Sequence, residues 1–196
     1  MRTRVLQEKN YAERMQNGVE PYLAAHAEEF YWERESGHPI HVLRYRAFRP
    51  RGVVVISHGF TENAEKYKEI VYYFIKEHFH VYLPEHCGHG KSYRLVDDPS
   101  LVYVDSYHRY VEDLLFVARK AKAEACGLPL VLYSHSMGGG IAAAVPESGL
   151  EFADDPSADR KSAVRRCKTD RSFCLCHRTR HTVCGRTETI PGNRKL

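Results

Sequence analysis

Ser136 is the residue of this chain whose surroundings best suit a nucleophile. It is the centre of Ser134-His135-Ser136-Met137-Gly138, which follows the apolar run Leu128-Pro129-Leu130-Val131-Leu132-Tyr133 and leads into Gly139-Gly140-Ile141-Ala142-Ala143-Ala144. A sharp turn from strand to helix strains its central residue and requires small neighbours two positions away, and this segment has Ser and Gly there. Free N–H groups at the start of the helix would face the same point. We predict that Ser136 is a nucleophile; the alternative is a glycine-rich turn that merely packs helix against sheet.

The segment Ser57-His58-Gly59-Phe60 follows an earlier apolar run and could supply the other half of such a site. A loop after an early strand can donate one backbone N–H to an oxyanion, and a glycine lets the backbone approach the substrate closely. We predict that the backbone N–H groups of Phe60 and Met137 are the two oxyanion donors. We expect four further residues to shape the site, with His58 a structural histidine and not the catalytic base: His58, Gly59, His135 and Gly138.

Three segments, taken in order, resemble the lysophospholipase and monoacylglycerol lipase branch of the α/β-hydrolases. They are His58-Gly59, Glu85-His86-Cys87-Gly88-His89-Gly90-Lys91-Ser92 and Ser134-His135-Ser136-Met137-Gly138-Gly139, and the match runs from about Phe30 to Ala144. The resemblance implies a serine hydrolase of single-chain lipid esters or small carboxylic esters, with no cofactor and no metal. Two positions depart from the usual pattern: Ser134 replaces a glycine, and Cys87 replaces a frequent arginine. The same motifs occur in peptidases and carbon–carbon hydrolases, so the reaction type is better defined than the substrate.

The hydrophobic pattern predicts the elements that position these residues. Short, mainly apolar runs at 53–56, 80–83 and 128–133, the first of them β-branched throughout, are typical of strands buried on both faces of a parallel sheet. Helices are expected at about 6–26, 64–78, 105–125 and 138–144, and strands at 29–34 and 40–46 should form a hairpin. We therefore predict an α/β fold, the N-terminal part of an α/β-hydrolase: a mostly parallel sheet with helices on both faces and an N-terminal β-hairpin, followed by a poorly structured tail. The site should lie at the carboxyl ends of the strands.

The composition changes near Ala144-Val145. Residues 145–196 hold 11 of the 29 basic residues and 7 of the 25 acidic ones. Residues 1–144 therefore hold 18 basic and 18 acidic residues. Of the 22 aromatic residues, just Phe152 and Phe173 lie in 145–196, together with four of the six cysteines. We divide the chain into an N-terminal helix (1–27), a partial α/β-hydrolase core (28–144) and a basic tail of low hydrophobicity (145–196).

The tail leaves the catalytic partners of Ser136 open. A hydrolase of this type has an acid and then a histidine after the serine, each on a loop that follows a strand, and no strand pattern is visible in 145–196. Three minor or alternative interpretations were weighed: partners supplied from Asp154, Asp155, Asp159, Asp170, His177 and His181; a zinc site of Cys167, Cys174, Cys176, His177, His181 and Cys184; and a disordered basic tail. We hypothesise instead that the reading frame shifts near Val145, so that the acid, lid and histidine regions are lost. Ser136 would then lack activation, and the chain would be an inactive remnant or an interaction module.

Charge and hydropathy limit the partners. The balanced charge of residues 1–144 gives no global attraction to nucleic acid. No apolar run is long enough for a membrane span, and the charged start lacks the apolar core of a signal peptide. We expect a cytoplasmic protein that binds a small lipid or carboxylic ester and touches a membrane surface at most transiently. The thiols of Cys87 and Cys126 are expected to be reduced, and a nucleophilic Cys87 would need a lowered pKa.

Overall fold

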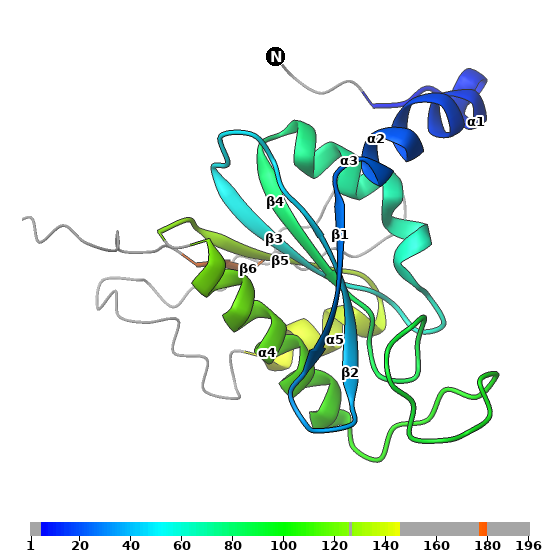
Figure 1. The fold of residues 1–196 in the computed structure, drawn as a ribbon, viewed down its shortest axis with the longest axis vertical. Coiled ribbons are helices and arrows are strands. Elements are labelled where there is room, and N and C mark those ends of the chain that lie inside the picture. Colours follow the sequence, from blue (N-terminus) through cyan, green and yellow to red (C-terminus); the bar gives the residue numbers. More distant parts are fainter. Residues whose placement is uncertain (1–4, 126, 146–176, 180–196) are drawn as a thin grey trace, which may run out of the picture.

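The computed structural model describes residues 5–125, 127–145 and 177–179. Their strands form one sheet in the order β1-β2-β4-β3-β5-β6 (Figure 1). The bounds are β1 Ala27–Glu33, β2 Pro39–Tyr45, β3 Gly52–Ser57, β4 Phe79–Pro84, β5 Leu130–Ser134 and β6 His177–Thr179. β1 and β2 form an antiparallel hairpin, and β3 runs parallel to both β4 and β5. The predicted hairpin and parallel core are confirmed.

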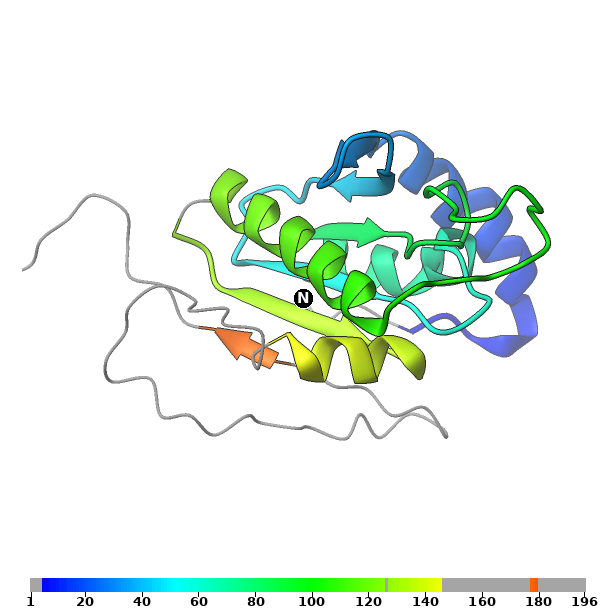
Figure 2. The ribbon, with the colours of Figure 1, turned by 90° about the horizontal axis from the view of Figure 1, so that it is seen from below.

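Helices cover both faces of this sheet. The side chains of β3 alternate between the two faces and pack against the helices on each. Val53 and Val55 pack in the cluster that includes α4 (Tyr107–Glu124) and α5 (Met137–Ala144). Val54 and Ile56 pack in the opposite cluster, with η3 (Ala64–Tyr67), α3 (Lys68–Lys76) and the N-terminal helical segment. Figure 2 shows α4 and α5 running along one side of the strands. A strand that buries both sets of side chains needs apolar residues throughout, which is why β3 reads as one continuous apolar run.

The N-terminal helix differs from the regular helix that the sequence predicts. It is divided into η1 (Glu8–Asn10), α1 (Tyr11–Arg14), η2 (Met15–Val19) and α2 (Glu20–Ala24), and η2 is one wide π turn. Proline at position 21 has no N–H to donate to the preceding turn, and its ring crowds that turn, so the widening accommodates it. Val19 and Leu23 of the predicted apolar face are buried, and they attach the segment to α3.

Two expectations need correction. The helix expected at 105–125 has an apolar stripe that begins with Tyr107 and predicts its burial, but Tyr107 is 46% exposed, and its hydroxyl donates to the Gly140 carbonyl oxygen at 2.7 Å. It is the first residue of α4, where the helix extends past the sheet and meets α5. The tail was expected to hold no strand, whereas His177–Thr179 pair antiparallel with Leu130–Leu132 of β5. The short β6 therefore covers part of the edge of β5.

Other predictions about the tail lie outside the described residues. These include the hypothesis of a frameshift and the zinc ligands. Val145 itself is described, and its side chain is buried in the core beside α4 and α5. Among the described residues, no helix has the length and apolarity that crossing a membrane requires.

Candidate active site

Ser136 occupies a strained junction between β5 and α5. Its backbone angles are φ 52° and ψ −120°, which side-chain-bearing residues rarely adopt. The Gly139 N–H donates to its carbonyl oxygen at 2.8 Å, and the Gly138 N–H donates to that of His135 at 2.9 Å. The chain thus turns from strand to helix within one residue and leaves Ser136 exposed at the carboxyl end of the sheet. This is the backbone arrangement of a nucleophile elbow.

Gly138 is a steric requirement of this turn. A Cβ atom at position 138 would lie 2.2 Å from the Ser57 carbonyl oxygen and 2.5 Å from that of His58. The Ser57 hydroxyl donates to the Gly138 carbonyl oxygen at 3.2 Å, so the start of α5 rests directly on the end of β3. By contrast, Cβ atoms at Gly139 and Gly140 would meet nothing within 4 Å.

The parallel register of β3 and β5 brings the two predicted halves of the site together. Ser57 pairs with Ser134, and the His135 N–H donates to the Ser57 carbonyl oxygen at 3.1 Å. The loop His58–Glu62 therefore begins beside the elbow. Within the described parts of the chain, neither the Phe60 nor the Met137 N–H donates to a protein acceptor. Met137 is the first residue of α5, where no intrahelical acceptor exists, so its N–H is available to a ligand.

His58 is fully engaged in holding this loop. Its Nδ1–H donates to the Gly59 carbonyl oxygen at 2.8 Å, and its Nε2 accepts the backbone N–H of His86 at 2.9 Å. Because an N–H can only donate and a carbonyl can only accept, these partners fix a neutral ring protonated at Nδ1. Burial lowers the pKa of His58 to about 4.

Two more histidines complete a neutral cluster under the loop. The His89 Nδ1–H donates to the Cys87 carbonyl oxygen at 2.9 Å, and its Nε2 accepts the Thr61 N–H at 3.2 Å. The His86 Nε2–H lies 3.0 Å from the Ser57 hydroxyl oxygen. Burial lowers the pKa of both rings, that of His86 well below its usual range. The segment 86–89 thus supplies two histidine side chains that pack under the loop and hydrogen-bond to Ser57 and Thr61.

Glu62 is a site residue that the sequence analysis did not single out. Its carboxylate accepts the Gly59 N–H at 2.7 Å and the Tyr67 hydroxyl at 2.6 Å, and lies 3.2 Å from His135 Nδ1. Burial alone would raise the pKa of Glu62, but hydrogen bonds from Lys66, Tyr67 and the Gly59 amide lower it to about 2. A Cβ atom at position 59 would lie 2.9 Å from this carboxylate, so a larger residue there would displace the Glu62 side chain. The sequence feature that could have indicated Glu62 is an acidic residue three positions after Gly59 in the same loop.

Cys87 does not have the properties of a nucleophile. It is 1% exposed, and burial raises the pKa of its thiol to about 11. A buried thiol that stays protonated is unreactive. The arginine that often precedes this Gly-His-Gly motif in the resembled branch is thus replaced by a small core residue.

The acid and base that a serine nucleophile needs are not found among the described residues. None of the described histidines forms a hydrogen bond to the Ser136 side chain. The candidates Asp154, Asp155, Asp159, Asp170 and His181 lie outside the described residues, and His177 is described as backbone in β6. The described residues also contain no cluster of His, Cys, Asp and Glu suited to a metal.

Comparison with protein families gives one match that covers half of the chain. The family of the serine aminopeptidase S33 matches residues 49–150. This range begins just before β3, contains both halves of the site, and ends close to the change in composition.

Curated relatives and solved structures agree with this match. Lysophospholipase L2 of Escherichia coli is 35% identical over 103 residues, which are 53% of this chain and 30% of that protein. Monoacylglycerol lipase of Mycolicibacterium smegmatis is 36% identical over 92 residues, 47% of this chain and 31% of the relative. The chain thus spans about a third of the length of the curated relatives it matches.

Among solved structures, a thermostable carboxyl esterase from Bacillus coagulans superposes with a TM-score of 0.55 at 25% identity. The superposition covers 61% of this chain and 39% of the esterase. Monoglyceride lipase of Saccharomyces cerevisiae superposes with a TM-score of 0.53 over 64% of this chain and 41% of the lipase. Its 23% identity supports the fold alone.

Proposed function

The chain belongs to the serine aminopeptidase S33 family of α/β-hydrolases, and from that premise we propose that Ser136 is the nucleophile of a carboxylic-ester hydrolase. In this proposal the Ser136 hydroxyl attacks the ester carbonyl and the Phe60 and Met137 N–H groups stabilise the oxyanion. The alcohol then leaves and water hydrolyses the acyl-enzyme.

The strained backbone of Ser136 is the observation that carries the proposal. A residue with φ 52° costs conformational energy, and the close packing of Gly138 on Ser57 and His58 maintains the strain. The elbow lies beside a loop that a carboxylate and three histidines hold in place, and the two amides proposed as donors have no protein acceptor among the described residues. A turn that merely packed helix against sheet would need neither the strain nor the free amides.

The substrate that we propose is a single-chain lipid ester. Two of the relatives described above are named lysophospholipase L2 and monoacylglycerol lipase. Since they match this chain over about a third of their own length, the acyl-chain and head-group preferences are not assigned. The cytoplasmic location and the transient contact with a membrane surface stay predictions from the sequence.

The second candidate is a chain that has the fold of a hydrolase but does not catalyse hydrolysis. It is favoured by the histidines of the site: His58, His86 and His89 are neutral, buried and committed to loop structure. None of these three can take the proton of Ser136, and a serine hydroxyl without a base is a weak nucleophile.

A fluorophosphonate probe distinguishes the two, because it labels an activated serine. Labelling of the 196-residue chain that is lost in Ser136→Ala supports catalysis by Ser136. A folded chain that resists labelling, with no Ser136-dependent hydrolysis of a monoacylglycerol, supports the second candidate. Circular dichroism of both chains establishes that they are folded. Reading the coding DNA in its other two frames past codon 144 tests the frameshift, which requires strand and helix patterns there with a late Asp and His.

A further inference from the structure

Three hydrogen bonds to one segment, 85–89, hold the loop that carries the Phe60 amide. His58 accepts the His86 N–H, and Thr61 donates to His89. The third attachment is made by Glu85, whose Oε1 accepts the Ala64 N–H at 2.9 Å. Ala64 begins η3, so this bond fixes the point at which the loop ends. All three attachments come from residues 85–89, directly after β4.

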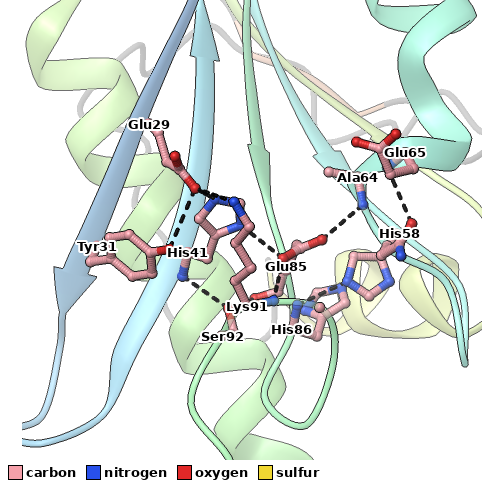
Figure 3. A network of polar contacts seen from close by, with 12 residues as sticks. Glu29, Tyr31, His41, His58, Ala64, Glu65, Glu85, His86, Lys91 and Ser92 are labelled. Atoms are coloured by element: carbon pink, nitrogen blue, oxygen red, sulfur yellow. Dashed lines mark hydrogen bonds and ion pairs between the residues drawn. The ribbon is translucent and has the colours of Figure 1, made fainter.

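Glu85 also holds its own loop. Its Oε2 accepts the Lys91 backbone N–H at 2.7 Å and lies 2.7 Å from His41 Nδ1 (Figure 3). The Ser92 hydroxyl donates to the Glu85 carbonyl oxygen at 2.5 Å. The backbone fits closely over the carboxylate, since a Cβ atom at Gly90 would lie 2.0 Å from Oε2. The Glu85 side chain is 4% exposed, so its charge is almost entirely removed from water.

His41 of β2 lies between two carboxylates. Its Nδ1 faces Glu85, and its Nε2 lies 2.7 Å from the Glu29 carboxylate, which also accepts a bond from the Lys91 ammonium at 2.7 Å. Each ring nitrogen of His41 thus faces a carboxylate oxygen, which only accepts hydrogen bonds when ionised. Burial alone would raise the pKa of Glu85, but hydrogen bonds from His41 and from the Ala64 and Lys91 amides lower it to about 2.

We propose that Glu85 is a positioning residue for the oxyanion hole: its carboxylate holds the loop that carries the Phe60 amide through Ala64, with His41 as its hydrogen-bond partner. This inference rests on the proposed function of Ser136 and adds the residue that sets where one oxyanion donor lies. Glu85 touches neither the nucleophile nor the oxyanion amides, so it acts through the backbone.

Glu85→Gln tests the proposal with little change in volume. The amide of Gln has one acceptor oxygen for three donors, and the Lys91 and His41 donors share one side of the carboxylate. The oxygen is expected to stay with that pair, so the Gln NH2 group would face the Ala64 N–H and break that bond. Glu69→Gln is the matched control. Glu69 lies on α3, accepts hydrogen bonds from the Tyr11 and Tyr73 hydroxyls, and has no described hydrogen bond to the site loops.

Two readouts separate this proposal from the proposed function. In Glu85→Gln, hydrogen exchange at the Ala64 amide should accelerate at least tenfold and the Phe60 amide signal should shift in NMR spectra, while Glu69→Gln changes neither. If the wild type is labelled by a fluorophosphonate, the labelling step should slow about tenfold while probe affinity changes less than twofold. A wild type that resists labelling would contradict the role of Ser136, but the exchange experiment would still test Glu85.

Unchanged exchange at Ala64 and an unchanged Phe60 signal in Glu85→Gln would overturn the proposal. If that variant does not fold, His41→Gln gives a second test, since it removes the imidazole ring that contacts the Glu85 carboxylate. Exchange at Ala64 and Lys91 should then be faster than in the wild type. Identical exchange in His41→Gln and the wild type would equally refute the role of the pair.

Discussion

The two halves of the candidate site are built by different kinds of interaction. The elbow at residues 134–140 is fixed by steric contacts and backbone hydrogen bonds, with Gly138 packed on the Ser57 carbonyl oxygen. The loop at 58–64 is fixed by hydrogen bonds of buried polar side chains: Glu85 and His89 accept its amides, and its own His58 accepts the His86 N–H. The elbow should therefore respond sharply to an added methyl group and little to pH, and the loop should respond to protonation.

Gly138→Ala is expected to have the largest effect on the elbow. Its new Cβ would lie 2.2 Å from a backbone oxygen, which cannot move without displacing the end of β3. The free energy of unfolding should fall by about 3 kcal/mol or more. Urea denaturation followed by circular dichroism measures this change.

The control is Gly139→Ala, one residue further along the same helix. A Cβ there meets nothing within 4 Å, so the better helix propensity of alanine should leave stability unchanged or raise it by up to about 1 kcal/mol. Similar losses in the two variants would show that the contact with Ser57 is not what fixes the elbow.

The loop should lose stability on acidification. The pKa of His58 is about 4 in the folded chain and near 6.5 when unfolded, so the unfolded chain binds the proton first as the pH falls. The contribution of the neutral ring is complete above about pH 6.5 and is lost towards pH 4, where His58 accounts for roughly 3 kcal/mol. His86 and His89 act in the same direction. Glu62 and Glu85, with pKa values of about 2, follow at lower pH.

Unfolding in urea at pH 7, 6, 5 and 4 measures this dependence. His58→Gln should be less stable at pH 7 but should lose less stability between pH 6.5 and 4. His108→Gln, at an exposed position of α4, should keep the slope of the wild type. Equal slopes in His58→Gln and the wild type would mean that the loop is not what responds to acid.

Ser136→Gly should have the smallest effect, and a stabilising one. Glycine adopts φ 52° without the steric cost that serine bears, so the free energy of unfolding should rise by about 1 kcal/mol. Ser136→Ala keeps the Cβ and hence the strain, so its stability should match the wild type. A gain in both variants would locate the effect in the hydroxyl, and no gain in either would show that the strain is small.

The elbow could be predicted from the sequence because its causes are local. Its parts are contiguous in the sequence: the apolar run at 128–133, the small residues at 134 and 138, and the helix that follows. Each part can be recognised from the residue types that it needs. The order of strands and helices likewise follows from patterns within single elements. The wide turn before Pro21 was not predicted, because Gly18 and Pro21 indicate that a helix is weakened but not how it adapts.

The sequence by itself determined the α/β fold, the placement of Ser136 at the end of a buried strand and the pairing of two loops at one edge of the sheet. Tertiary structure alone decided what holds the second loop: the tautomers of His58 and His89, the bond from Glu85 to Ala64 and the contact of Glu62 with His135. Each of these joins residues from different elements. A hydrogen bond depends on distances of a few tenths of an ångström and on which groups are removed from water, and neither is encoded in the spacing of residues along the chain.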